Sequence, residues 1–304
     1  MRLFFAPLQG YTDFVYREIH NEAVGCVDGY FMPFLRWDGG MRNRDIRDIL
    51  PENNDEVPVV PQVIAADCDE LKSLLDVVEE CGYSHVDLNM GCPFPLQTGR
   101  GRGAALLSCP DKVQAMMEEL SGRELHFSVK MRSGMTELDE GLTIIDLLND
   151  YDLDFITIHP RFGIQQYKGD VDMDAFAMMA EKSRHGIVYN GDMTTVEKMH
   201  ETEHRFPDLY GLMVGRGLLA RPTLSREWRD GVTMTPQEVR RVTMQMHDRL
   251  FDYACRTLQG EQQVLSRMRS FWEYQKPLVD KKVYKRLMRT TSLRNYEEAV
   301  RNLG

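Results

Sequence analysis

Cys92 has the sequence setting that most suggests chemistry. It lies in the stretch Leu-Asn-Met-Gly-Cys-Pro, residues 88–93, where an apolar segment runs into a turn. A cysteine that serves packing is usually flanked by apolar residues, whereas Gly91 and Pro93 give this thiol an open and fixed backbone. The next ten residues contain three glycines and two arginines, which bring backbone amides and positive charge near the thiol. The motif alone is consistent with a catalytic thiol or with a buried structural cysteine.

Strands and helices alternate along most of the chain. Short apolar or β-branched segments predict eight strands, over residues 2–6, 30–35, 57–64, 85–89, 127–131, 155–159, 186–190 and 209–214. Between them, helical spacing of apolar residues predicts helices around Leu71, Leu74, Leu75 and Val78, and around Val113, Met116, Met117 and Leu120. Eight strand and helix units favour an α/β fold of the (β/α)8 TIM-barrel type over an open, doubly wound sheet.

Polar and glycine residues follow the predicted strands at their C-terminal ends. They are Pro7 to Gly10, Gln62, Asn89 to Pro93, Lys130, Arg132, His159, Asn190 to Asp192, and Gly215 to Gly217. In a barrel these positions line one mouth, where catalytic groups lie and where the last two loops commonly hold a phosphate. Short glycine turns expose backbone N–H groups, and Arg216 could grip a phosphate with its forked guanidinium.

Composition indicates a globular chain without membrane or metal sites. The 304 residues are 42% hydrophobic and 28% charged, and no run of about 18 apolar residues occurs. The N-terminus has too short an apolar segment for a signal peptide. Six cysteines are scattered without a CxxC pair, which argues against zinc and against a disulfide framework. We therefore expect a cytoplasmic, monomeric protein that binds neither metal nor membrane.

Charge divides the chain into two parts. Residues 234–304 carry 14 Lys and Arg against 8 Asp and Glu, although the whole chain has 37 against 47. This difference predicts a boundary near residue 232, with an acidic barrel domain over 1–232 and a basic domain over 233–304. A basic segment of this kind could bind nucleic acid, or it could dock on the acidic barrel.

Several motifs together resemble one family. They are residues 6–10 with Thr12 and Asp13, 61–63, 87–93, 103–107, 128–134, 158–159, 190–192 and 213–217. With these stretches the chain resembles the tRNA-dihydrouridine synthases, which are FMN-dependent oxidoreductases that reduce particular uridines in tRNA. The tail resembles the small helical domain of that family, and residues 267–272 with the basic segment 281–289 are most similar to the dihydrouridine synthase C branch.

The resemblance implies a role for each motif. FMN would be held by Pro7, Leu8, Gln9, Gln62, Lys130, His159, Asn190, Gly191, Asp192, Gly215 and Arg216. The substrate would contact Asn89, Arg132 and Arg161 in the barrel and Lys281, Lys282, Lys285 and Arg286 in the tail. Saturating the uracil C5–C6 bond needs a hydride, implied to come from FMN reduced by NADPH or NADH, and a proton. Cys92 is the implied proton donor, and as a thiol with an ordinary pKa near 8.5 it is mostly protonated at neutral pH.

Two loops depart from the family pattern. The sequence His159-Pro160-Arg161-Phe162 stands where the family commonly has His-Gly-Arg-Thr, and the loop after Cys92 lacks the usual early lysine or serine. These departures concern substrate selection more than FMN binding. Two alternatives stay open: an FMN barrel dehydrogenase acting on a small molecule, which gives no reason for the basic tail, and a flavin-free RNA-binding protein.

Overall fold

A computed structural model describes residues 1–303 and contains one curled parallel sheet of ten strand segments. The segments are β1 (Arg2–Phe5), β2 (Gly29–Phe31), β3 (Leu35–Arg36), β4 (Val59–Val60), β5 (Gln62–Ile64), β6 (His85–Met90), β7 (His126–Gly134), β8 (Ile156–Phe162), β9 (Ile187–Tyr189) and β10 (Gly211–Val214). Every predicted strand is present. The first strand, β1, pairs with the last, β10.

Ten segments make eight barrel positions because two strands are each broken at a proline. Pro33 separates β2 from β3, and Pro61 separates β4 from β5. Proline lacks the N–H that a ladder needs, so it interrupts strand pairing. Pairing resumes after both breaks, since β2 pairs with β4 and β3 pairs with β5, with the register shifted by one residue between Phe31↔Val60 and Leu35↔Val63. The predicted (β/α)8 barrel is confirmed.

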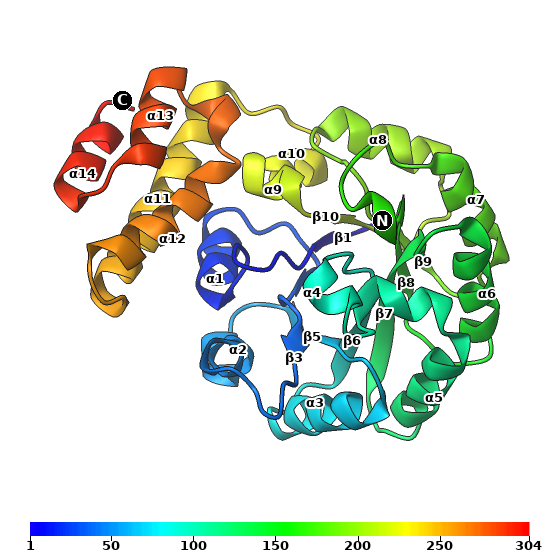
Figure 1. The fold of residues 1–304 in the computed structure, drawn as a ribbon. Helices are drawn as coiled ribbons and strands as arrows, with labels where there is room; N and C mark the ends of the chain where they lie inside the picture. Colours follow the sequence, from blue (N-terminus) through cyan, green and yellow to red (C-terminus); the bar gives the residue numbers. More distant parts are fainter. Residues whose placement is uncertain (304) are drawn as a thin grey trace.

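Helices surround the barrel, and one short helix, residues 95–98, lies over its open end (Figure 1). They are α1 (Phe14–Ala23), α2 (Asn43–Ile49), α3 (Cys68–Glu80), α4 (Pro95–Thr98), α5 (Pro110–Ser121), α6 (Leu138–Leu148), α7 (Met173–Lys182), α8 (Val196–Arg205), α9 (Arg216–Ala220) and α10 (Leu224–Asp230). The apolar residues that predicted α3 and α5 are the buried residues of those helices. No helix within residues 1–303 is long and apolar enough to cross a membrane.

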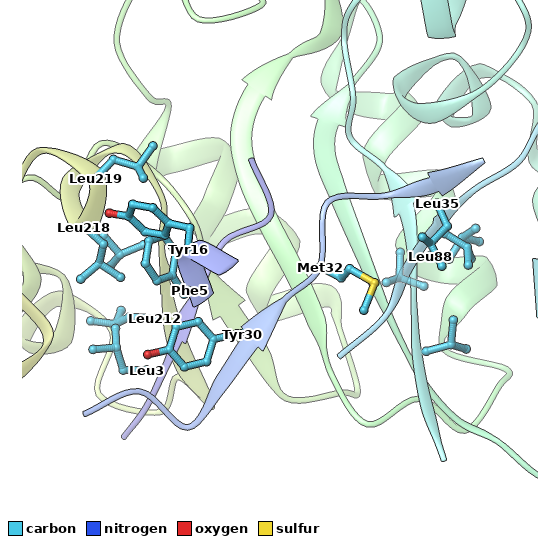
Figure 2. Close-up of a cluster of buried hydrophobic side chains, with 14 of the residues drawn as sticks. Leu3, Phe5, Tyr16, Tyr30, Met32, Leu35, Leu88, Leu212, Leu218 and Leu219 are labelled. Carbon is cyan, nitrogen blue, oxygen red and sulfur yellow. The ribbon is translucent and has the colours of Figure 1, made fainter. Parts of the chain in front are cut away.

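Strand residues alternate between the barrel interior and the helical layer. In β1, Leu3 and Phe5 belong to the large core beneath the helices, where Figure 2 shows them beside Leu212 and the α9 residue Leu218. Phe4 instead faces inward and stacks on Phe155 at 5.3 Å between ring centroids. This alternation follows the two-residue period of a strand. The inward aromatic rings fill one level of the barrel.

The C-terminal helices form a small all-α domain beside the barrel (Figure 1). They are α11 (Pro236–Thr257), α12 (Glu261–Glu273), α13 (Lys281–Arg289) and α14 (Leu293–Arg301). Their core contains Trp272, whose indole N–H donates to the Tyr296 hydroxyl at 2.7 Å. Trp272 and Phe271 are thus buried core residues of this domain. The division at residue 232 remains a prediction.

Charged groups join the helical domain to the barrel. Arg267 of α12 pairs with Asp13 at 2.5 Å, and Arg249 of α11 pairs with Glu22 of α1. The Gln275 side chain also donates to the Leu219 carbonyl. The docking face therefore uses α11, α12 and the segment after α12, and it leaves α13 available for other contacts.

Candidate active site

A cavity of about 500 Å³ opens at the C-terminal ends of the strands. Most of the predicted site residues line it: Pro7, Leu8, Gln9, Asn89, Cys92, Lys130, Arg132, His159, Asn190, Gly191, Asp192, Gly215 and Arg216. Gln62 and Arg161 do not line it, and the four basic residues of the tail lie on α13. A volume of this size suits a cofactor or a nucleotide.

The Cys92 loop is held by hydrogen bonds on both sides. The Oδ1 atom of Asn89 accepts from the backbone N–H groups of Gly91 at 3.0 Å and Cys92 at 2.9 Å. Arg132 donates from Nε to the Gly91 carbonyl at 2.9 Å. The Cys92 carbonyl accepts from the Ala104 N–H, and a Cβ on Gly103 would lie 2.6 Å from that oxygen. Glycine is therefore required at 103, where φ is +62°.

Burial keeps the Cys92 thiol protonated. Only 8% of the residue is exposed, and it contacts Phe34 and Ile64. Desolvation raises the pKa of the Cys92 thiol because the thiolate would lose its hydration, although Arg132 and Lys130 partly oppose this effect. A protonated thiol at a cavity wall is suited to donate a proton.

Lys130 presents a free cation to the cavity. Within residues 1–303 its Nζ atom has no hydrogen bond and no ion pair, although the side chain is largely enclosed. Burial, together with repulsion from Arg132, lowers its pKa to about 8. A positive charge without a partner inside a cavity favours an anionic or acceptor-rich ligand.

Arg161 fixes the tautomer of His159. Its guanidinium lies 3.0 Å from the Nε2 atom of His159, and because arginine only donates, that nitrogen carries no hydrogen. The hydrogen of the neutral ring is then on Nδ1, which can donate to a ligand. Burial and nearby cations hold the pKa of His159 well below its usual range, so the ring is neutral. Arg161 is itself buried and donates to Asp192 and to the Gly169 carbonyl.

The loops after β9 and β10 form the other end of the cavity. Asp192 accepts from Arg216 at 2.6 Å as well as from Arg161, and these partners lower its pKa despite its burial. The guanidinium of Arg216 also lies 4.9 Å from the Tyr167 ring centroid. A side chain on Gly217 would clash with the Met193 carbonyl at 2.1 Å, so the close approach of the two loops requires glycine. Free N–H groups at the first turn of α9 add donors there.

The cavity also contains residues that the strand-end pattern did not identify. Tyr167 follows β8 by five residues, and Tyr274 comes from the helical domain. Arg36 and Arg44 also line the cavity, and Arg36 ends β3, so the strand-end rule could have found it. The tyrosines carry no sequence signal, because loop and interdomain positions have no periodicity.

Exposed apolar side chains surround the mouth. Phe94 is 49% exposed, Leu96 82% and Tyr167 42%, and all three line the cavity. The rings of Phe94 and Tyr167 lie 6.1 Å apart. Ile164, beside the same loop, is 62% exposed. Apolar surface gathered at an opening marks a region where another molecule binds.

The α13 surface is strongly basic. Lys281, Lys282, Lys285 and Arg286 are all exposed. Arg286 pairs with Glu298 at 3.0 Å, and Lys285, Arg286 and Arg289 border a shallow hollow that extends to Asn295. The buried Leu287 attaches this helix to the domain. The lysines therefore face solvent.

Together these features define a barrel enzyme whose cavity is lined by a thiol and by a set of hydrogen-bond donors. The donors are Lys130, the Nδ1–H of His159 and Arg216, and they fit FMN, which offers ring carbonyls and nitrogens at one end and a phosphate at the other. Gly215 and Gly217 at the start of α9 line the same end of the cavity. Within residues 1–303 no cluster of His, Cys, Asp or Glu could hold a metal ion.

Comparison with known proteins agrees with this class. The dihydrouridine synthase (Dus) family model matches residues 4–303. The chain is 26% identical to the probable tRNA-dihydrouridine synthase 2 of Bacillus subtilis, over 80% of this chain and 77% of that one. It is 25% identical to tRNA-dihydrouridine synthase B of Pasteurella multocida, over 74% and 68%. The chain belongs to the dihydrouridine synthase family and is an FMN-dependent oxidoreductase.

Solved structures with the same fold include other barrel proteins. A variant of NCR from Zymomonas mobilis aligns with a TM-score of 0.52 and 13% identity, over 77% of this chain and 88% of that chain. Histamine dehydrogenase from Rhizobium sp. 4-9 aligns with a TM-score of 0.56 and 10% identity, over 82% and 48%. At such low identity the likeness extends to the fold alone. The similarity to the dihydrouridine synthase C branch remains a prediction.

Proposed function

We propose that this protein reduces the C5–C6 double bond of uridines in tRNA, with Cys92 as the proton donor. The observation that carries the proposal is the juxtaposition of a protonated, loop-held thiol with the donors of Lys130 and His159 in one cavity. In a member of the dihydrouridine synthase family, this arrangement supplies both parts of the reaction.

The residues of the chain divide the chemistry between them. When bound, FMN that has been reduced by NADPH or NADH supplies the hydride for uracil C6. Cys92 donates its proton to C5, so one hydride and one proton together saturate the bond. Lys130 and Arg216 hold the ring and phosphate ends of the cofactor. Asn89 donates one amide hydrogen to the Gln62 oxygen, and its second amide hydrogen can donate to a carbonyl of the base.

Two surfaces support tRNA over a small molecule as the substrate. Phe94 and Tyr167 at the mouth can stack on bases that have left a helix, which an RNA loop can provide. The basic α13 face supplies contacts for phosphates at a distance from the mouth. A target uridine must be turned out of its stack to reach Cys92. A small-molecule dehydrogenase would use neither surface.

The test is direct. The purified protein should be yellow, with a flavin spectrum, and should convert uridine to dihydrouridine in tRNA transcripts when NADPH is supplied. Mapping of dihydrouridine in tRNA from cells with and without the gene identifies the position. Flavin reduction without any dihydrouridine in tRNA would reject the proposal and favour a small-molecule dehydrogenase. A colourless protein that binds tRNA would favour the flavin-free alternative.

The cellular setting follows from the proposed substrate. A tRNA-modifying enzyme of this kind acts in the cytoplasm, and one chain has both the cavity and the basic helical domain. We therefore propose a cytoplasmic enzyme that acts as a monomer. Light scattering of the purified protein measures its mass and would contradict the monomer if it gave a dimer.

A further inference from the structure

A buried carboxylate below the cavity has no part in the chemistry described above. Asp87 of β6 faces the barrel interior and is fully buried. Within residues 1–303 it has no ion pair. It accepts hydrogen bonds from the Ser128 hydroxyl at 2.6 Å and from the Gln62 amide at 2.7 Å. A buried charge is costly to maintain, so its partners indicate what it does.

Hydrogen bonds connect Asp87 to the Cys92 loop. Gln62 donates from Nε2 to Asp87, and its Oε1 atom accepts from the Nδ2 atom of Asn89 at 2.7 Å. The Oδ1 atom of Asn89 in turn accepts from the N–H groups of Gly91 and Cys92. Three consecutive side chains thus link the barrel interior to the backbone that carries the thiol.

The donor and acceptor roles along this series of hydrogen bonds are determined at both of its ends. An ionised carboxylate can only accept, so it requires the NH2 group of Gln62 to face it. Backbone N–H groups can only donate, so they require the oxygen of Asn89. If either amide turned over, two donors or two acceptors would face each other in a buried site. Burial raises the pKa of Asp87 to about 6, which still leaves it ionised at neutral pH.

We propose that Asp87 and Gln62 are positioning residues that orient the Asn89 amide and thereby hold the Cys92 loop. The role in catalysis rests on the proposed function of Cys92 as the acid. Gln62 was predicted to contact FMN, but it is fully buried and does not line the cavity. Its oxygen is the acceptor that keeps Asn89 from turning over.

Three variants distinguish the Gln62–Asp87 hydrogen bond from the Asn89–Gln62 hydrogen bond. Gln62→Met removes both contacts. Gln62→Glu keeps an acceptor for Asn89 but sets a carboxylate against Asp87. Combining Gln62→Glu with Asp87→Asn restores a donor and acceptor pair there, with the original charge. Thr157→Val is the matched control, because the Thr157 hydroxyl is buried and has no hydrogen-bond partner in the described part of the chain.

Hydrogen–deuterium exchange of the FMN-loaded protein measures the loop directly. In Gln62→Met, we expect the amides of Gly91 and Cys92 to exchange at least about tenfold faster than in wild type. Gln62→Glu should keep these amides protected but unfold at a lower temperature, and adding Asp87→Asn should recover that loss. Thr157→Val should change neither quantity. Single-turnover reduction of tRNA should slow in Gln62→Met at unchanged flavin content.

The outcomes that overturn the proposal are distinct. Normal exchange at Gly91 and Cys92 in Gln62→Met, or the same loss of protection in Gln62→Glu, would show that the acceptor does not hold the loop. Loss of FMN with normal exchange would assign Gln62 to the cofactor instead. If Gln62→Met fails to fold, the other two variants still decide, since additive loss in the double variant would reject the link to Asp87. None of these exchange measurements requires activity on tRNA.

Discussion

At the scale of single residues, the site separates a proton donor from the groups that bind the cofactor. Cys92 is buried and neutral, whereas Lys130 is a cation with no ion-pair partner among residues 1–303. Both face one cavity, so each can be altered while the other is left in place. This separation allows the acid and the cofactor contacts to be tested independently.

Replacing Cys92 by Ala should remove only the proton transfer. We expect dihydrouridine formation to fall by about 100- to 10,000-fold, the usual contribution of a general acid, at normal flavin content and tRNA affinity. Single-turnover kinetics and an absorption spectrum measure the two quantities. Cys109→Ser is the control, because Cys109 does not line the cavity. Near-normal turnover in Cys92→Ala would exclude this thiol as the acid.

The charge of Lys130 should make FMN binding depend on pH. In the ligand-free protein its pKa is lowered to about 8, so the lysine is charged below that pH and neutral above it. FMN affinity should therefore weaken as the pH rises through about 8. Lys130→Met should bind FMN more weakly and lose this step. Fluorescence titration of flavin-stripped protein between pH 6.5 and 9.5 measures the effect, and an equal step in the variant would assign it to another group.

The sequence predicts which residues reach the mouth better than it predicts how deep they lie. Cys92, Lys130 and His159 were correctly placed in one cavity, because the ends of parallel strands meet at one edge. Arg161 lies near the end of β8 but is buried, and Gln62 begins β5 and so lies deeper in the barrel; neither lines the cavity. A strand contributes several inward side chains at different depths, and the period of two does not tell which one is uppermost.

At the scale of elements, a buried arginine fixes the loop that follows Cys92. Arg102 is 2% exposed and donates to both oxygens of Glu70 in α3, at 2.7 and 2.8 Å. It also donates to Asp38, after β3, at 2.9 Å. The loop is thereby attached to two neighbouring units of the barrel. The local sequence suggested only positive charge near the thiol, because the partners are more than 30 residues away.

Removing Arg102 should destabilise the protein far more than removing its neighbour. Arg102→Met leaves the partly buried Glu70 without its ion-pair partner and removes one of the partners of Asp38, which should cost about 3 kcal/mol of unfolding free energy. Arg100→Met is the control, since Arg100 contacts the same Asp38 but its side chain is 60% exposed, and it should cost less than about 1 kcal/mol. Urea unfolding compares the two. Equal losses of unfolding free energy would show that the buried contacts of Arg102 stabilise the protein no more than the exposed contact of Arg100.

At the scale of the whole molecule, the helical domain both docks on the barrel and leaves a basic face free. The sequence left docking and RNA binding as alternatives, and the structure assigns docking to other residues. Arg249 and Arg267 pair with barrel carboxylates, whereas the lysines of α13 face solvent. The charge difference along the chain predicted a basic tail but not this division, because pairing depends on which helix faces meet after folding.

Reversing the charge of the α13 face should weaken tRNA binding and reduce its dependence on salt. Replacing Lys281, Lys282, Lys285 and Arg286 by Glu removes up to four phosphate contacts, and each lost contact lowers the slope of log affinity against log salt by roughly 0.7 to 0.9. Flavin content and NADPH oxidation without tRNA should not change. Glu substitutions of Lys182 and Lys198, on α7 and α8, are the control for general charge effects. A folded variant with the wild-type salt slope would show that tRNA binds elsewhere on the molecule.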